Sequence, residues 1–411
     1  MSLWAGQSIS EIGSSVTTLA LPLTAVVTLH VSTFQVGLLS AATTAAWMLV
    51  ALPAGMFVDR FAKRTLMLSA DLARMLLIGS IPLAAFAHLL TVGQLYSVAL
   101  LTGIATVIFT ISFQSYVPML VSREQLVDAN GKLSTSQEVA DLVGPALGGG
   151  LVGLLGAAGA MIADTFSYAA SVGSLLLIKS REPPRERGRA FSLRELMAGL
   201  SFVFKEPVLR RTAECTAIFN LCTSLTVSLE IIFLIRILHV RPAYTGLVMA
   251  ASALGGVIGG AVSGRLSRLI GSVRIIWVSV LGFGLIGLLL PLAQPGWGIL
   301  LFIVGSAGQS FTAVTYTVAQ VSYRQAVCPP MLLGRMNAAI RWVMWGLLPV
   351  GGVLAGVLGS AIGIRSTLWI GTVGAWAAGI LLLFSPLRSM RDQPEANVNY
   401  AESPAVDQAR S

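Results

Sequence analysis

The chain has 411 residues, of which 55% are hydrophobic and 11% are charged, and its mean hydropathy is +0.81. This composition excludes an ordinary soluble domain, because a soluble fold cannot bury so large an apolar fraction. The formal net charge of +9 does not indicate nucleic-acid binding, since the basic residues lie in gaps between apolar runs, where positive charge orients membrane proteins.

Apolar runs follow one another along the whole chain, separated by short polar gaps. Each is close to the length of about 20 residues that a helix needs to cross a bilayer. The first run has no basic segment before it and no clear cleavage site after it, so we expect a retained span. We predict an all-α integral membrane protein with twelve transmembrane helices. The predicted spans are 3–28, 34–57, 66–88, 94–119, 131–154, 157–179, 209–237, 243–264, 273–293, 297–321, 336–359 and 364–386.

The distribution of Lys and Arg predicts how the chain is oriented. The gaps at 58–65 and 121–132 carry three and two basic residues, and the stretch 179–211 carries nine. The alternate gaps of the first half, near His30 and His88, carry none, and the second half shows the same bias. Because basic residues are retained on the cytoplasmic side, we expect both termini to face the cytoplasm in a multi-pass protein of the cell membrane.

A charged turn between the second and third predicted spans recurs in the second half of the chain. Residues Gly55–Arg64 read GMFVDRFAKR, and 205 residues after Gly55 the stretch Gly260–Arg268 repeats the glycine, an apolar residue and the basic residues at the same offsets. The acidic residue is not repeated, because Gly264 stands where Asp59 would fall. Such a repeat predicts two pseudo-symmetric six-helix bundles with parallel topology.

One long polar linker joins the two predicted bundles. Glu182–Arg187 is rich in Pro and charge, and Ser192 is placed to cap a short amphipathic helix that ends near Phe204 on the membrane surface. The residues after Leu387 are rich in Pro, Asp, Asn, Glu and Ser, a composition typical of disorder. The predicted parts are a first bundle at 1–179, a cytoplasmic linker at 180–208, a second bundle at 209–387 and a disordered cytoplasmic tail at 388–411.

Several motifs resemble the major facilitator superfamily, and the resemblance covers nearly the whole chain. The turn Gly55–Arg64 resembles the superfamily's loop between spans two and three, although Ala62 stands where glycine is usual. In predicted span five, Gly144–Gly149 resembles the antiporter motif of drug-exporting members. Segments such as Val121–Asn130 and Glu206–Arg210 resemble the branch that holds enterobactin exporters and macrolide efflux pumps.

The resemblance implies a role for the turn and for the antiporter-like motif, and each also has a plainer explanation. The turn either fixes topology alone or also latches a cytoplasmic gate, with Asp59 offsetting the positive N-terminal end of predicted span eleven. The motif of span five either serves ordinary helix packing or seals the bundles together, with span eight as its partner. The residues concerned are Gly55, Asp59, Arg60, Lys63 and Arg64 in the turn, and Gly144, Pro145, Gly148 and Gly149 in span five.

Ionisable side chains inside a membrane are costly and usually face a cavity or a partner. Asp71 lies three residues before Arg74 and Glu214 lies near two arginines, so structural ion pairs explain both acids. Asp164 has no partner in its own predicted span. Two acids three residues apart in span five repel each other, which suits a pair that takes up and releases a proton; hydrogen bonding to other helices is the alternative for Glu138. The candidates for proton coupling are Glu11, Glu138, Asp141 and Glu230.

Aromatic side chains in several predicted spans could line a pocket for an apolar cargo. They could equally pack against neighbouring helices or lie at the membrane interfaces, and the sequence leaves both explanations open. Arg341 could be a counter-ion for Glu138 or a contact for the cargo. The aromatic candidates are Trp47, Phe109, Phe113, Phe219, Trp342 and Trp345.

These features favour secondary active export, in which two bundles rock about a site near the middle of the membrane. We expect a proton gradient to drive a lipophilic or amphiphilic small molecule outward through a monomer, with the lipid bilayer as its surroundings and with no cofactor, metal or nucleic acid. The alternatives are a symporter or facilitator for uptake, which the antiporter-like motif argues against, and a membrane-embedded enzyme or scaffold. No metal-binding spacing, nucleophilic set or phosphate-binding loop is recognisable in the sequence, so we do not expect an enzyme.

Overall fold

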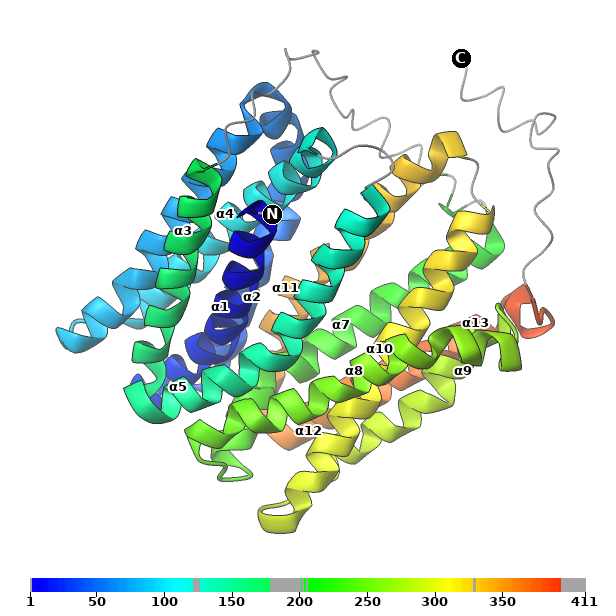
Figure 1. The fold of residues 1–411 in the computed structure, drawn as a ribbon. Coiled ribbons are helices and arrows are strands. Elements are labelled where there is room, and N and C mark those ends of the chain that lie inside the picture. The colour runs from blue at the N-terminus through cyan, green and yellow to red at the C-terminus, as the bar shows by residue number, and fades with distance from the viewer. Residues whose placement is uncertain are drawn as a thin grey trace.

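The structure is a computed structural model that describes residues 2–120, 126–177, 201, 203–204, 206–327 and 330–392. Helices in two groups run through these residues (Figure 1). The first group holds α1 (Ser2–Leu23) with its π-helical continuation η1 (Thr24–Thr28), α2 (Thr33–Arg60), α3 (Lys63–Phe86), α4 (Val92–Leu120) and α5 (Leu126–Leu176). The second holds α7 (Pro207–Arg236), α8 (Pro242–Ile270), α9 (Arg274–Leu281), η3 (Phe283–Leu292), η4 (Gly296–Gly298), α10 (Ile299–Val327), α11 (Pro330–Ala361), α12 (Ile364–Ala378), α13 (Ile380–Leu383) and η5 (Pro386–Arg388).

The helices have the lengths and composition of membrane spans. Ten helical stretches of the described residues are long and apolar enough to cross a bilayer, and α11 contains a shorter apolar stretch, Trp345–Ala361. One of the ten, Thr135–Leu176, has 42 residues, about twice the length that a bilayer needs. Gly156 interrupts it with φ 75° and ψ 168°, between predicted spans five and six. A helical multi-pass membrane protein is therefore confirmed, while the count of twelve spans and the side of the termini stay predictions.

The charged turns are shorter in the structure than the sequence analysis predicted. α2 continues to Arg60 and α3 begins at Lys63, which leaves a turn of two residues. In the second half, α8 continues to Ile270, beyond the predicted end at residue 264. Long basic side chains can extend from a helix end to the membrane surface, so their charge does not require the helix to stop.

The linker and the tail are described only in part. Most of 180–208 lies outside the described residues, so the amphipathic helix stays a prediction. The predicted tail begins with a docked segment: the carbonyl oxygen of Arg391 accepts hydrogen bonds from the backbone N–H groups of Val273 and Arg274 at 3.0 and 3.2 Å. An Asp392 carboxylate oxygen accepts one from the Ser272 N–H at 3.0 Å. Residues 393–411 lie outside the described residues.

The two groups meet along the pairs α2–α11 and α5–α8, and both contacts depend on glycine. Gly37 lies so close to Gly352 and Gly356 that a Cβ would overlap the backbone of α11. Gly149 faces Gly246 in the same way. Small residues let membrane helices approach closely, and van der Waals contact then stabilises the pair.

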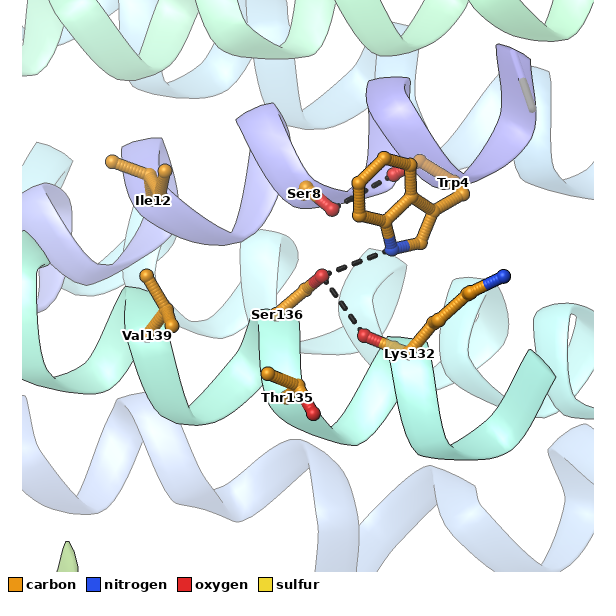
Figure 2. Close-up of a pocket in the computed structure, with 7 residues that line it drawn as sticks. All are labelled: Trp4, Ser8, Ile12, Lys132, Thr135, Ser136 and Val139. Atoms are coloured by element: carbon orange, nitrogen blue, oxygen red, sulfur yellow. Dashed lines mark hydrogen bonds between the residues drawn. The ribbon is translucent and has the colours of Figure 1, made fainter. Parts of the chain in front are cut away.

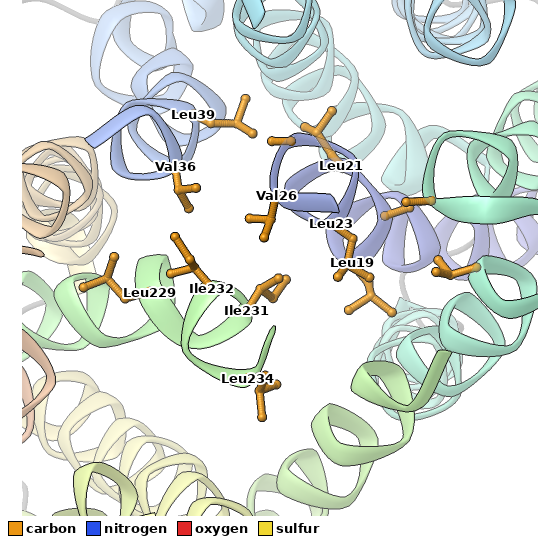
Figure 3. Close-up of a cluster of buried hydrophobic side chains, with 14 of the residues drawn as sticks. Leu19, Leu21, Leu23, Val26, Val36, Leu39, Leu229, Ile231, Ile232 and Leu234 are labelled. Atoms are coloured by element: carbon orange, nitrogen blue, oxygen red, sulfur yellow. The ribbon is translucent and has the colours of Figure 1, made fainter. Parts of the chain in front are cut away.

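Both glycine contacts lie at one end of the molecule, which we call the closed end: the end of the turns at 29–32, 237–241 and 362–363. Here Val26, Val36 and Leu39 of the first group meet Leu229 and Ile232 of α7 in one buried apolar cluster (Figure 3). Toward the opposite end, where α1 begins and η5 lies, the two groups of helices diverge (Figure 1). The bundles are therefore joined at one end.

The first turn of each group has the same sequence and the same backbone. Leu29–Val31 and Leu238–Val240 both read Leu-His-Val, and the two histidines have left-handed φ angles of 51° and 54°. In both turns the valine N–H bonds to a carbonyl six residues earlier, at 3.1 and 2.9 Å. This repeat, which our sequence analysis did not use, is further support for duplication.

Replacing Gly149 with Ala should weaken the joint between the bundles, because the new Cβ would lie 2.8 Å from the backbone oxygen of Ala243. We expect a loss of about 1–3 kcal/mol in stability, seen as a lower midpoint of thermal unfolding in detergent. Gly150→Ala is the matched control, because a Cβ there meets nothing within 4 Å. Equal midpoints of thermal unfolding for Gly149→Ala and Gly150→Ala would contradict the close contact between α5 and α8.

Candidate functional site

α1 lies against both parts of α5, on either side of the Gly156 break. In the second part, a Cβ on Gly13 would overlap the side chain of Ser167. In the first part, a Cβ on Gly144 would overlap the side chain of Ser15. These close approaches bring the polar side chains of α1 into direct contact with those of α5, and they build the candidate site.

A buried ion pair lies behind this contact. Arg74 and Asp71 of α3 form a salt bridge, and both side chains are almost fully buried. The second carboxylate oxygen of Asp71 accepts a hydrogen bond from the Ser171 hydroxyl at 2.6 Å. The structure therefore agrees with the prediction that Asp71 and Arg74 are structural partners.

Two aromatic rings enclose the Arg74 guanidinium. Its central carbon lies 4.3 Å from the Phe109 ring centre and 4.7 Å from that of Tyr168, distances at which the cation attracts the ring faces. The hydroxyl groups of Tyr168 and Ser14 are hydrogen-bonded at 2.9 Å. Arg74 Nε is buried and has no hydrogen-bond partner in the described part of the chain. The ion pair is thus tied to α1, α4 and α5.

Asp164 is a second buried acid beside the ion pair. Its carboxylate accepts hydrogen bonds from the hydroxyls of Thr17 at 2.5 Å and Ser167 at 2.9 Å, and its exposed fraction is 0%. Arg74 and Asp71 are near enough to interact with it electrostatically. The prediction that Asp164 has no partner in its own span is therefore wrong, because Ser167 lies in that span, and the second partner, Thr17, comes from α1.

Glu11 of α1 and Asp141 in the first part of α5 are near enough to interact electrostatically, and we call these two acids the carboxylate pair. The Glu11 carboxylate accepts a hydrogen bond from Gln7 at 2.5 Å, and Asp141 accepts one from Gln137 at 3.2 Å and another from Ser15 at 3.5 Å. Glu11 is half-buried and also lies near Gln137 and Asp141, and Asp141 is exposed. Two acids on different helices are therefore brought together at a solvent-accessible place.

The other predicted coupling residues are Glu138, three residues before Asp141 on α5, and Glu230 in the second bundle. Glu138 is exposed on α5, and the structure places Asp141 beside Glu11 on α1. Glu230 lies on α7, toward the closed end, and is 9% exposed. It has no hydrogen-bond or ion-pair partner among the residues that the structure describes.

A cleft of about 550 Å³ opens between α1 and the first part of α5, and Figure 2 shows the residues that line it. Trp4 covers one side and donates its indole N–H to the Ser136 hydroxyl at 3.0 Å, while Ile12 and Val139 make the apolar wall. Glu11 precedes Ile12 directly on α1. The cleft is lined by Trp4, Ser8, Ile12, Lys132, Thr135, Ser136 and Val139.

The predicted aromatic cavity is not brought together in one place. Phe109 is 3% exposed and stacks on Phe113 with ring centres 5.9 Å apart, so it supports Arg74 inside the first bundle. Phe219 is buried near Tyr316 in the second bundle. Trp47 of α2 and Trp345 of α11 meet edge to face across the bundles, with ring centres 4.1 Å apart. The side chains of Arg341 and Trp342 lie outside the described residues.

The predicted gate loop is described in part. Arg64 donates to the carbonyl oxygens of Leu175 and Leu176 at 3.0 and 3.1 Å, which ties the start of α3 to the end of α5. Lys63 donates to the Val58 carbonyl at 3.4 Å, and the side chain of Arg60 is exposed. The surroundings of Gly55 and Asp59 are outside the described set, so the latch stays a prediction.

In the described part of the chain, hydrogen bonds of Arg236 and Ser228 cross between the bundles at the closed end. Arg236 of α7 donates to the Val31 carbonyl oxygen at 2.5 Å. The Ser40 hydroxyl of α2 bonds to the Ser228 hydroxyl of α7 at 2.7 Å. They join the apolar cluster of Figure 3 and the glycine contacts in holding this end shut.

Four residues of the site and of the closed end were not predicted from the sequence: Thr17, Tyr168, Ser171 and Arg236. Two of them, Tyr168 and Ser171, belong to a polar stripe that a helical wheel would have revealed. Residues 164, 167, 168, 171 and 174 are all polar and recur at intervals of three or four in an apolar span, the spacing of one helix face.

A family profile described as transmembrane secretion effector matches residues 1–410. The chain belongs to this family, within the major facilitator superfamily. The transporter is 26% identical over 375 residues to the enterobactin exporter EntS of Citrobacter koseri, covering 88% of this chain and 86% of that protein. EntS of Escherichia coli O127:H6 gives the same figures. The protein is therefore a membrane efflux transporter of the cell membrane and not an enzyme.

The fold is also that of solved transporters. A bacterial homologue of the iron transporter ferroportin, in its inward-facing state, matches with a TM-score of 0.73 and 13% identity, covering 93% of this chain and 97% of that one. The outward-facing state of such a homologue matches with a TM-score of 0.58 and 14% identity, covering 95% and 99%. Of these two structures, the inward-facing one superposes on this chain with the higher TM-score.

Removing Arg74 should destabilise the transporter, because Asp71 would remain buried as an unpaired charge. We expect Arg74→Met to cost about 3–5 kcal/mol, measured as the midpoint of thermal unfolding in detergent. The double variant Arg74→Met/Asp71→Leu should recover most of this loss, since it removes both charges. Arg211→Ala, which breaks a half-exposed pair with Glu214, is the control and should cost less than about 1 kcal/mol. Equal losses for Arg74→Met and Arg211→Ala would contradict the assignment of a buried pair.

Proposed function

We propose that the protein exports an amphiphilic small molecule across the cell membrane by proton antiport and alternating access. The observation that carries the proposal is that Glu11 and Asp141 are near enough to interact electrostatically, on the same two helices, α1 and α5, that line the cleft. The chain also resembles exporters over 88% of its length. A protonated pair is neutral and an ionised pair is doubly negative. Loss of protons from this pair therefore adds negative charge near the cleft that the cargo would enter, and binding of protons removes it.

The closed end and the diverging end of the two bundles support export by alternating access. We assign the closed end to the outside and the diverging end to the cytoplasm, because the basic turns between α2 and α3 and between α8 and α9 lie at the diverging end and basic residues are retained inside. The nearer likeness to an inward-facing transporter supports the same assignment. Alternating access then requires Arg236–Val31 and Ser40–Ser228 to separate as the outer end opens.

The cleft limits the chemistry of the cargo. Its wall combines an indole, branched apolar side chains, a few hydroxyls and the side chain of Lys132, which suits a molecule with an aromatic or apolar body and some polar groups. Enterobactin, the compound in the names of the relatives, is the first candidate for this class. Trp47 and Trp345, which meet between the bundles, are proposed to close over the cargo path.

The number of spans, the oligomeric state, the bundle limits and the energy source are proposed as the sequence predicts them. We propose twelve spans in a monomer, with bundles at 1–179 and 209–387 and with the proton gradient as the energy source. Glu230 and Glu138 are secondary candidates for proton coupling, after Glu11 and Asp141. Uptake by symport is the alternative, but the close packing of Gly149 against α8 favours export.

Transport should depend on a pH gradient and on the carboxylate pair. In proteoliposomes with an imposed pH gradient we expect uphill movement of enterobactin, erythromycin or ethidium. Glu11→Gln and Asp141→Asn should each lower the gradient-driven rate about 10-fold or more, the usual order for loss of a proton-transferring group. Exchange of cargo without a gradient should continue in both variants.

Glu214→Gln is the control, because Glu214 is paired with Arg211 at the end of α7 and should transport normally. Transport that ignores the pH gradient in the wild type would exclude proton antiport. Transport that is driven by the gradient but unchanged in both variants would move the coupling site elsewhere.

Arg236→Leu should shift the transporter toward its outward-open state, because it removes a hydrogen bond that crosses the closed end. The measurement is the alkylation rate of a cysteine introduced at Leu39, inside the apolar cluster, by an impermeant maleimide added from outside. We expect the rate to rise several-fold, since a net hydrogen bond to a charged donor contributes about 1.5–3 kcal/mol. Arg241→Leu, in the neighbouring turn, should leave the rate unchanged. No change in either variant would refute the role of Arg236.

A further inference from the structure

Three buried ionisable groups inside the first bundle would have a net negative charge if all of them were ionised. Asp71, Arg74 and Asp164 are all within 5% of complete burial. Ionised together they would carry one positive and two negative charges. An uncompensated charge in such surroundings is costly, so the cluster is neutral only when it also binds one proton.

The contacts indicate which acid takes that proton. Asp71 is in contact with Arg74 and also accepts a hydrogen bond from Ser171, so it has the partners of an ionised carboxylate. Asp164 has two neutral hydroxyl partners, Thr17 and Ser167. A hydroxyl can accept a hydrogen bond as readily as donate one, so Thr17 serves a protonated Asp164 without any change of position.

The surroundings of Asp164 contain no other source of compensating charge among the described residues. The charged or titratable groups that face it are Arg74 and Asp71 from α3 and Tyr168 from its own helix. Arg74 is already engaged with Asp71, and Tyr168 is bonded to Ser14. α1 contributes the Thr17 hydroxyl and the Gly13 backbone.

We propose that Asp164 is the buried proton-binding carboxyl group of the first bundle, neutral in this conformation and ionised when α1 moves away from the second part of α5. The proton on Asp164 then passes to water that enters between the helices, and Asp164 and Arg74 are left to attract each other. The role of this proton in transport rests on the proposed antiport, whereas the protonation of Asp164 does not.

A movement of α1 would change the surroundings of both Asp164 and Glu11. Asp164 Oδ1 lies 2.7 Å from where a Cβ on Gly13 would stand, so α1 itself excludes water from the acid. The same helix carries Glu11 on the side of the first part of α5. A shift of α1 therefore acts on the exposed carboxylate pair and on Asp164 at once.

The test is infrared difference spectroscopy of the full chain in proteoliposomes, with the proton alone as the probe. At neutral pH the wild type should show the carbonyl stretch of a buried protonated carboxylic acid. Asp164→Asn keeps the size and the hydrogen bonds of the side chain, so it should fold, and it should lose this component. Glu214→Gln is the control and should retain it.

A second pair of variants keeps Asp164 and changes its partner. Thr17→Val removes the hydroxyl bonded to the acid, and the frequency of the band should shift. Thr17→Ser keeps the hydroxyl and should leave the band where it is. All proteins in this comparison also carry Glu230→Gln, so that the buried acid of the second bundle does not contribute to the band. A band that is intact in Asp164→Asn, or one that is unmoved in Thr17→Val, would then overturn the assignment.

Transport in the same vesicles separates this inference from the proposed function. A band that depends on Asp164, in a protein whose transport ignores the pH gradient, would support the proton site and exclude antiport. Gradient-driven transport in a wild type that lacks the band would support antiport and overturn the proton site.

Discussion

The cost of charge in a membrane interior is the constraint on which the first bundle depends. Arg74 can lie there because Asp71 neutralises it and because the rings of Phe109 and Tyr168 cover its faces. These partners come from α3, α4 and α5, and Ser14 of α1 is bonded to Tyr168. Four helices are therefore held in one arrangement by a single guanidinium group. The same requirement of neutrality leads to the proton that we assign to Asp164.

The joint between the bundles follows from a different force. Lipid chains are as apolar as the helix surfaces, so the hydrophobic effect does not drive helices together within the membrane, and close van der Waals contact must do so. Gly37 and Gly149 allow this contact with α11 and α8 at the closed end. Because these contacts are numerous but individually weak, such a joint can open without the loss of a strong ion pair. Arg236 and Ser228 add directional hydrogen bonds across it.

The two bundles share a topology but differ in their polar interiors. The first holds the buried ion pair, Asp164 and a stripe of hydroxyls along α5. In the second, Glu230 is the one buried acid that the described residues contain. The charged turn shows the same asymmetry, since Gly264 stands in place of Asp59. In the proposed mechanism the first bundle handles the proton, and the second provides the opposing wall that α7, α8 and α11 form.

The sequence by itself determined the membrane class, the approximate position of each helix and the duplication, because bilayer thickness and the cost of charge act on every local stretch in the same way. It also identified Asp71 with Arg74, whose spacing of three residues makes them neighbours on any helix. The pairing of Asp141 with Glu11, and of Asp164 with Thr17, was decided only by the tertiary structure. Helical periodicity says which residues share a face but not which helix that face meets, and these partners lie 130 and 147 residues apart along the chain.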